Sequence, residues 1–443
     1  DVARHNSFSR LVTPECLFCH VGHLKVEEDN AFKMTIIERS IGCERCHGPG
    51  QAHVAAAESG SLEGIRDGTK DSVDPLIVHP GKLDRSASEA VCQQCHLQAA
   101  TQITASGKNV WDFRPGQTLA ENRSDFQLAG EKAFKIVGHV EQLHVSRCYI
   151  ESDMTCVTCH DPHHRPPTED LPELYRNVCL SCHEDQACGL TKDVRLERND
   201  NDCAKCHMPR SETNVAHASL HHHTIAVHAD GRVPKRKVEP SLPLWPVLSE
   251  QSLSSFEQLR RKSMAIVDSA VADAGAAASQ DVLLTSVNGL MDAFRRKLAD
   301  RAMRLSLAML AESTGETEMA ISTSQSLLDD PDRSDLRHSL ALEILASQTF
   351  QQGDNAAALA LYEELVGQRL VASDFYFLGL CRRNAGDHAG AKEACEKALR
   401  LNPDFIPAHS LLGVELQESD PDRASLHFRM VEALRRIEET KGP

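Results

Sequence analysis

The sequence is poor in aromatic residues and has no long apolar run. Phe, Tyr and Trp make up only 4% of the 443 residues, so such side chains can fill only part of an interior of ordinary size. No stretch approaches the ~20 apolar residues of a membrane-spanning helix. The first ten residues, DVARHNSFSR, lack the charged-then-apolar pattern of a signal peptide. These absences predict a chain that is soluble as given, without a transmembrane segment.

Positive charge is also in deficit. The chain has 48 Lys and Arg residues against 64 Asp and Glu residues, which gives a formal net charge of -16. A surplus of this sign repels nucleic acids and anionic lipids at long range. We therefore expect no nucleic-acid partner.

Cysteine and histidine are abundant and unevenly distributed. Fourteen of the 16 cysteines and 19 of the 23 histidines precede residue 230, and the remainder is rich in Ala, Leu, Glu and Arg with helical periodicity. Between the two parts, residues 231–246 contain four prolines and a basic cluster, as expected of an extended linker. We predict a mostly α protein in which an irregular, loop-rich domain with short helices (1–230) and a linker (231–250) precede an all-α domain (251–443).

The pentapeptide Cys-x-x-Cys-His occurs six times in the first part. On one helical turn, positions i and i+3 share a face, so both thiols can bond to the two vinyl groups of one haem while the next histidine faces the iron. Zinc knuckles and disulfides are the alternatives, but neither requires a histidine after each pair, and histidine is only 23 of 443 residues. The motifs predict six haem c groups with their iron. The thioether cysteines are Cys16, Cys19, Cys43, Cys46, Cys92, Cys95, Cys156, Cys159, Cys179, Cys182, Cys203 and Cys206, and the proximal histidines are His20, His47, His96, His160, His183 and His207.

Thirteen other histidines in this part can supply the second axial ligands. His53 follows the Gly-Pro-Gly turn at 48–50, which directs it toward a neighbouring haem rather than its own. His163 follows His160 by three residues, so it can likewise bind the iron of a neighbouring haem. His164 is the alternative ligand at this position. The preferred distal set is His53, His79, His144, His163, His217 and His223; outside it remain His23, His139, His222 and His228, with His5 unranked.

Two cysteines of the first part, Cys148 and Cys188, belong to no pentapeptide. They form either a disulfide or two separate buried thiols.

The second part contains a repeat of about 34 residues. In its clearest copy, 372–405, Gly379, Ala391 and Pro403 fall at the offsets of a tetratricopeptide helix pair, where small residues allow close helix packing and proline ends the second helix. We expect three to four such repeats in an α-solenoid, with Cys381 and Cys395 as buried small side chains.

The segments IGCERCHGPGQAH, EAVCQQCHLQ, SRCYIESDMTCVTCHDPHH and CAKCHMPR resemble exported bacterial multihaem cytochromes with C-terminal tetratricopeptide repeats. That group is similar to the superfamily of tetrahaem cytochrome c, hydroxylamine oxidoreductase and pentahaem nitrite reductase. The resemblance covers roughly residues 10 to 228 and, separately, the repeats. It implies export to the periplasm or the cell exterior, where covalent haem attachment takes place, and closely packed haems.

The same resemblance implies two classes of function. The first is electron transfer through six mostly bis-histidine haems, with the repeats docking a redox partner or further copies of the chain, as in a conductive filament. The second is a haem oxidoreductase acting on a small nitrogen or sulfur oxyspecies at one five-coordinate iron. The sequence departs from the enzymes, because it has no pentapeptide ending in lysine and its tyrosines Tyr149 and Tyr175 lie in unmatched contexts. Electron transfer is therefore the preferred function, and no catalytic residue is assigned.

Overall fold

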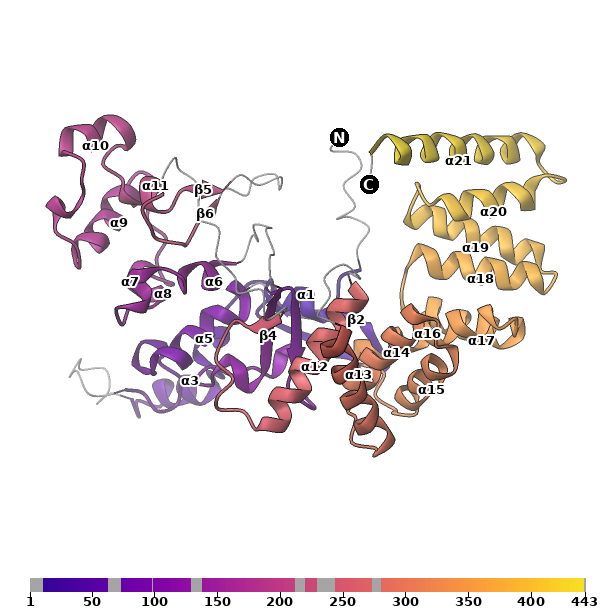
Figure 1. The fold of residues 1–443 in the computed structure, drawn as a ribbon, viewed down its shortest axis with the longest axis horizontal. Helices are drawn as coiled ribbons and strands as arrows, with labels where there is room; N and C mark the ends of the chain where they lie inside the picture. Colours follow the sequence, from indigo (N-terminus) through magenta and orange to yellow (C-terminus); the bar gives the residue numbers. More distant parts are fainter. Residues whose placement is uncertain are drawn as a thin grey trace. The chain divides into compact units, whose positions relative to one another are not determined.

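The computed structural model describes residues 11–62, 73–97, 99–128, 138–211, 220–228, 244–272 and 280–441. The chain is mostly helical, as predicted (Figure 1). It divides into two compact units. The repeat unit comprises residues 1–17, 23–39 and 287–443, and the pentapeptide unit comprises residues 18–22 and 40–286.

The pentapeptide unit consists of short helices and two small sheets. Its helices are α2 (Glu44–His47), α3 (Gln51–Glu58), η3 (Pro80–Lys82), α5 (Arg85–His96), η4 (Val110–Asp112), η5 (Leu119–Glu121), α6 (His139–Leu143), α7 (Arg147–Ile150), α8 (Cys156–Cys159), α9 (Leu171–Leu180), η6 (Asp185–Ala187), α10 (Lys192–Asn199), α11 (Cys203–His207) and α12 (Ser255–Ala272). Its strands are β3 (Thr101–Thr104), β4 (Arg123–Leu128), β5 (Arg210–Ser211), β6 (Leu220–His221) and β7 (Leu244–Pro246). Helix α1 (Pro14–Phe18) and helix α13 (Gln280–Arg295) each run across the border between the units.

An antiparallel sheet in the order β3-β4-β7 supports the best-packed part of this unit. In register, Thr101 pairs with Phe126, and Phe126 pairs with Pro246. The side chain of Phe18 is 1% exposed and belongs to an apolar cluster with residues of α5, η4 and η5. Strand β7 falls within the predicted linker, whose residues 231–243 lie outside the described residues.

Helix α12 packs on β3 and β7, and two buried arginines attach it. The guanidinium of Arg261 donates to the carbonyl oxygen of Ala120 over 2.7 Å and to Oγ of Ser124 over 2.9 Å, while its Nε lies 2.7 Å from Oε1 of Glu257. Arg260 donates to the carbonyl oxygen of Thr104 over 3.0 Å. Helix α12 therefore belongs to the pentapeptide unit, although it lies within residues 251–443, the predicted all-α domain. The domain boundaries predicted from the sequence remain predictions.

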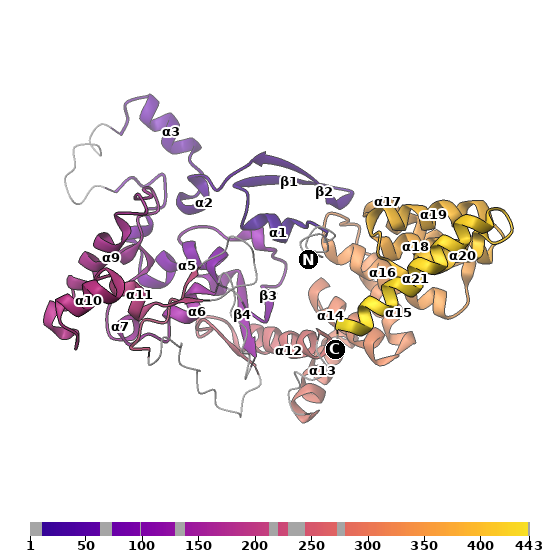
Figure 2. The ribbon, with the colours of Figure 1, turned by 90° about the horizontal axis from the view of Figure 1, so that it is seen from above.

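The repeat unit contains four helix pairs, stacked in series (Figures 1 and 2). They are α14 (Arg301–Thr314) with α15 (Thr317–Leu328), α16 (Leu336–Gln351) with α17 (Asn355–Gln368), α18 (Ala372–Asn384) with α19 (His388–Leu401), and α20 (Ile406–Leu416) with α21 (Pro421–Lys441). A Cβ added to Gly379 of α18 would lie 3.3 Å from Sγ of Cys395 and 3.4 Å from the carbonyl oxygen of Ala391. The close approach predicted at this glycine is confirmed, and Cys381 and Cys395 are buried free thiols, as expected.

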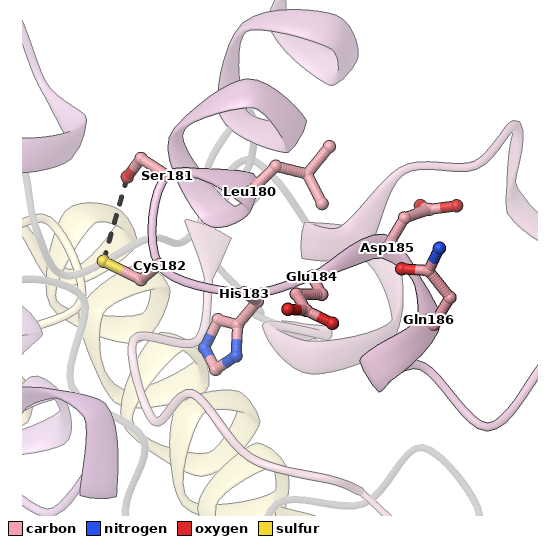
Figure 3. Close-up of a pocket in the computed structure, with 7 residues that line it drawn as sticks. All are labelled: Leu180, Ser181, Cys182, His183, Glu184, Asp185 and Gln186. Atoms are coloured by element: carbon pink, nitrogen blue, oxygen red, sulfur yellow. Dashed lines mark hydrogen bonds between the residues drawn. The ribbon is translucent and has the colours of Figure 1, made fainter.

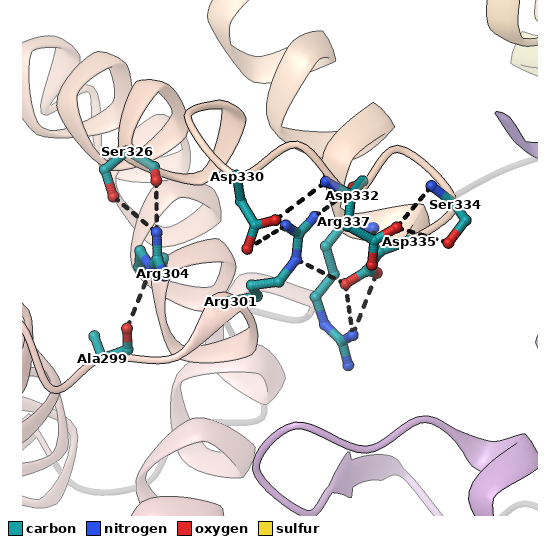
Figure 4. Close-up of polar contacts among 9 residues, drawn as sticks. All are labelled: Ala299, Arg301, Arg304, Ser326, Asp330, Asp332, Ser334, Asp335 and Arg337. Atoms are coloured by element: carbon teal, nitrogen blue, oxygen red, sulfur yellow. Dashed lines mark hydrogen bonds and ion pairs between the residues drawn. The ribbon is translucent and has the colours of Figure 1, made fainter. Parts of the chain in front are cut away.

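Arg301 joins the first two helix pairs (Figure 4). From the start of α14, its guanidinium lies 2.8 Å from Oδ2 of Asp330 and donates to Oδ2 of Asp335 over 2.9 Å. It also donates to the carbonyl oxygen of Asp332 over 3.1 Å. One side chain thus holds the connection between α15 and α16.

A β-hairpin from the N-terminal part of the chain belongs to the repeat unit. Strands β1 (His23–Glu27) and β2 (Asn30–Glu38) pair antiparallel, and β2 contacts α16 and α17. The amide of Asn30, which is 3% exposed, donates to the carbonyl oxygen of Gln368 over 2.9 Å. The segment between the first two pentapeptides therefore packs on the helical repeats, which the sequence did not indicate.

We predict that Arg261→Met destabilises the pentapeptide unit by about 3–5 kcal/mol, because Glu257 would keep a carboxylate in a site that has lost one of its cations. Arg296→Met, which removes an exposed ion pair with Asp292, serves as the control and should change stability by at most about 0.5 kcal/mol. Urea unfolding of both variants measures the difference. Equal midpoints would contradict the structural role of Arg261.

Candidate haem-binding sites

Each pentapeptide lies on, or at the end of, a helical turn. The first begins in α1, the second spans α2, the third ends α5, the fourth spans α8, the fifth begins in α9, and the sixth is α11. In three of them, the N–H of the histidine donates to the carbonyl oxygen of the first cysteine: His47 to Cys43 over 2.9 Å, and His160 to Cys156 and His183 to Cys179 over 3.0 Å each. This turn places both cysteines and the histidine together, as attachment of one porphyrin requires.

None of the sixteen cysteines is in a disulfide; all are free thiols. For Cys148 and Cys188, the structure supports the second alternative, two separate thiols, each of which is half-buried. Burial raises the pKa of the Cys148 thiol. The twelve pentapeptide thiols are thus available for thioether bonds.

Backbone carbonyl groups fix the tautomer of two proximal histidines. Nδ1 of His47 lies 2.8 Å from the carbonyl oxygen of Val78, and Nδ1 of His207 lies 2.9 Å from that of Ala226. Since a carbonyl oxygen can only accept, Nδ1 carries the proton and Nε2 keeps its lone pair for a metal. Nδ1 of His160 faces the hydroxyl of Tyr175 at 3.4 Å.

Burial keeps several of these imidazoles neutral, which is the form that binds a metal. It lowers the pKa of His96 and the pKa of His160. Burial, with the neighbouring His139, lowers the pKa of His223 to about 3.

Three proximal histidines have a second imidazole close by. The ring centres are 5.9 Å apart for His47 and His163, and 6.2 Å apart for His160 and His223. Two imidazoles that bind one metal ion from opposite sides, through bonds of about 2 Å, have ring centres roughly 6 Å apart. His96 has its neighbour in His139, at 5.2 Å. His163 and His223 were in the preferred distal set; His139 was not.

The other candidates of that set make different contacts. Nδ1 of His53 hydrogen-bonds to the carboxylate of Asp74. His144 stacks on Tyr149 with ring centres 4.5 Å apart, and its Nε2 lies 3.6 Å from Oε2 of Glu89.

His79 directly follows Val78, which binds His47, and His217 lies outside the described residues, as does His5. Nothing in the sequence singles out His221, yet its Nδ1 lies 2.8 Å from the carbonyl oxygen of Met208, the arrangement that frees Nε2 for a metal. A histidine run such as 221–223 carries no periodicity that tells one ring from the next.

Apolar side chains around the later pentapeptides can cover a porphyrin face. Ile150, Val157 and Leu196 are 64%, 47% and 48% exposed, respectively. A pocket of about 460 Å³ is lined by residues 180–186, including Cys182 and His183 of the fifth pentapeptide (Figure 3). The donor set and its surroundings therefore fit haem c.

The pentapeptides form a continuous series through contacts between them. Two thiol contacts join the third pentapeptide to others: Cys95 to Cys19 of the first, and Cys92 to Cys156 of the fourth. The second contacts the third through the carbonyl oxygen of Arg45, which accepts a 3.1 Å hydrogen bond from Nε2 of Gln94. From the fourth, the series continues to the fifth and sixth, because α9 packs on both α8 and α11. Burial, with the neighbouring Cys203, raises the pKa of Cys179 to about 11.

A buried carboxylate lies at the junction of the third and fourth pentapeptides. Glu89 of α5 is 3% exposed and accepts a 2.7 Å hydrogen bond from the hydroxyl of Tyr149. Nε of Arg85 lies 3.8 Å from its other oxygen. The charge of Glu89 therefore has a cationic partner.

Two protein-family profiles match parts of the chain. The doubled CXXCH motif matches residues 150–187, and the tetratricopeptide repeat matches residues 372–405. The first is a feature of multihaem c-type cytochromes and indicates covalent haem c binding; the second indicates protein–protein interaction. Both agree with the predictions from the sequence.

One curated relative is the dissimilatory sulfite reductase MccA of Wolinella succinogenes, which is 24% identical over 232 residues. The match covers 44% of this chain and 27% of that protein, so the chain spans about a quarter of its relative. Among solved structures, the MamA RS-1 ArsTM double mutant has a TM-score of 0.35 at 19% identity and covers 41% of this chain and 97% of its own. MamA 41-end from Desulfovibrio magneticus RS-1 has a TM-score of 0.34 at 19% identity and covers 40% and 96%, respectively.

Within the described ranges, no helix has both the length and the apolar character needed to cross a bilayer.

We predict that replacing Cys156 and Cys159 with serine removes one covalently bound haem, because both thioether bonds of the fourth pentapeptide are lost. Replacing the buried thiols Cys381 and Cys395 with serine is the matched control and should leave the haem content unchanged. Peroxidase staining after denaturing electrophoresis, quantified by pyridine haemochrome absorbance, measures the bound haem. An unchanged haem content in the first variant would contradict the assignment.

Proposed function

We propose that the chain is an electron-transfer protein with six c-type haems, exported to the periplasm or the cell exterior. The observation that carries this proposal is the continuous series of pentapeptides, in which each site contacts at least one other. When bound, haem iron alternates between two oxidation states and so carries one electron. A continuous series of attachment sites is what stepwise transfer needs.

The histidines of the chain hold each iron in a fixed environment. We assign His163 to the iron of the second site and His223 to that of the fourth, because their ring-centre distances match two ligands on opposite sides of one metal ion. We assign His139 to the third site because its ring contacts that of His96. Bis-histidine ligation keeps the geometry similar in both oxidation states, which suits electron transfer. His163 also joins two sites, since it follows the proximal histidine of one and faces that of the other.

The helical repeats serve docking in this proposal. Their partner is a redox protein or a further copy of the chain, which would extend the series into a filament. Export is part of this proposal because haem c is attached outside the cytoplasmic membrane.

A second candidate function is reduction of a small sulfur or nitrogen oxyspecies at one open iron. The similarity to a sulfite reductase over 44% of the chain favours it, and the pocket beside His183 offers space at one site (Figure 3). The two functions differ in whether an axial position is free.

We predict that the intact mass of the exported holoprotein exceeds that of the polypeptide by six haems. We also predict that carbon monoxide leaves the Soret band of the reduced protein unchanged, because every iron then has two protein ligands. A mass increase of fewer than six haems would reject the count. A substantial Soret shift would favour the oxidoreductase.

We predict that His163→Ala converts one of six low-spin sites to high spin, while the haem content stays the same, because the second ligand is lost and the thioether bonds remain. His164→Ala is the matched control, since it alters the neighbouring histidine. Electron paramagnetic resonance of the oxidised protein separates the two. A high-spin signal only in the His164 variant would reverse the assignment.

A further inference from the structure

We propose that Arg45, which pairs with no side-chain carboxylate in the described ranges, places a positive charge at the junction of the first three pentapeptides and thereby raises the reduction potentials of the haems attached there. The proposal rests on the proposed function. Higher potentials there would make the first three sites the part of the series where electrons accumulate.

Arg45 is the central residue of a contact among three pentapeptides. Its Nη2 donates to the carbonyl oxygen of Phe18 over 2.9 Å, and its own carbonyl oxygen accepts from Nε2 of Gln94 over 3.1 Å. Phe18, Arg45 and Gln94 are each the third residue of their pentapeptide, between the two cysteines. The guanidinium therefore lies beside the points where the first, second and third haems are attached.

Aromatic rings, rather than carboxylates, surround this guanidinium. Its central carbon lies 4.0 Å from the ring centre of Phe18 and 5.0 Å from that of Trp111, within the range of cation–π attraction. The two rings pack edge to face at 5.1 Å. Phe18 is 1% exposed, so water screens little of the charge on this side.

No side-chain carboxylate pairs with Arg45 in the part of the chain that the structure describes. Across the described ranges, no carboxylate oxygen lies within 4.0 Å of its nitrogens, and the adjacent Glu44 turns to the backbone N–H of Gly50, which donates to Oε1 over 2.7 Å. Arg123, by contrast, pairs with Asp125 at 3.0 Å, and Arg85 lies 3.8 Å from Glu89. Of these three arginines, Arg45 alone has no side-chain carboxylate beside it among the described residues.

A fixed cation favours the reduced state of a nearby redox group, because reduction removes one positive charge from that group. Arg45 belongs to the second pentapeptide and hydrogen-bonds to residues of the first and the third. Its charge therefore acts on the haems bonded to all three. Electrons that enter at the α9–α11 end of the series therefore move toward the first three sites.

Spectroelectrochemical titration of the six-haem holoprotein tests this proposal. Arg45→Met removes the charge and keeps an apolar chain on Phe18 and Trp111. We expect a shift of the most readily reduced haem to lower potential, equivalent to about a tenfold change in its ferrous-to-ferric ratio at fixed potential, or about 59 mV for a one-electron couple. Arg45→Lys keeps the charge and should shift it less.

The matched control is Arg114→Gln. Arg114, like Arg45, contacts Trp111: it donates to the carbonyl oxygen of Trp111 over 2.6 Å. Its side chain is exposed, so water screens its charge. Unchanged potentials in Arg45→Met, with six haems retained, would overturn the proposal. Loss of haem from Arg45→Lys as well as from Arg45→Met would also overturn it, since Arg45 would then be a packing residue. A failure of the proposed function looks different: the unmodified protein would lack six haems or would bind carbon monoxide.

Discussion

The rest of the pentapeptide unit depends on one helical turn that holds two thiols and an imidazole together. The hydrogen bond from His47 to the first cysteine of its motif closes that turn. A covalently bound group attached there is fixed to the backbone at two points, so its position follows from the fold of the polypeptide. The order in which the turns approach one another is then the order of the cofactors.

The pentapeptides differ in how closely the polypeptide packs around them. The best-packed part of the unit lies around α5, where Phe18 is almost fully buried and the first three pentapeptides meet. The later pentapeptides, on α8, α9 and α11, have more exposed apolar side chains around them, such as Ile150 and Leu196. The polypeptide thus packs a core of its own around the first three pentapeptides and leaves more apolar surface exposed around the later ones.

Features encoded within a few consecutive residues could be predicted from the sequence. The six pentapeptides form turns as their spacing requires, and the close helix approach at Gly379 follows from a repeat pattern that spans only 34 residues. The choice of distal ligands could not be predicted in this way. His139 faces His96 because α6 packs on α5, and nothing in the flanking residues of either histidine encodes that contact. The pairing of β7 with β4 joins residues more than a hundred positions apart, so the residues that flank each strand do not encode it either.

The hairpin formed by β1 and β2 has a consequence for the order of assembly. Its tip residue Asn30 bonds to Gln368, a partner 338 positions later in the chain. A contact of such sequence separation forms only after most of the polypeptide has been synthesised. The cysteines on either side of the hairpin, Cys19 and Cys43, therefore flank a segment whose final position is reached only when the helical repeats are present to receive it.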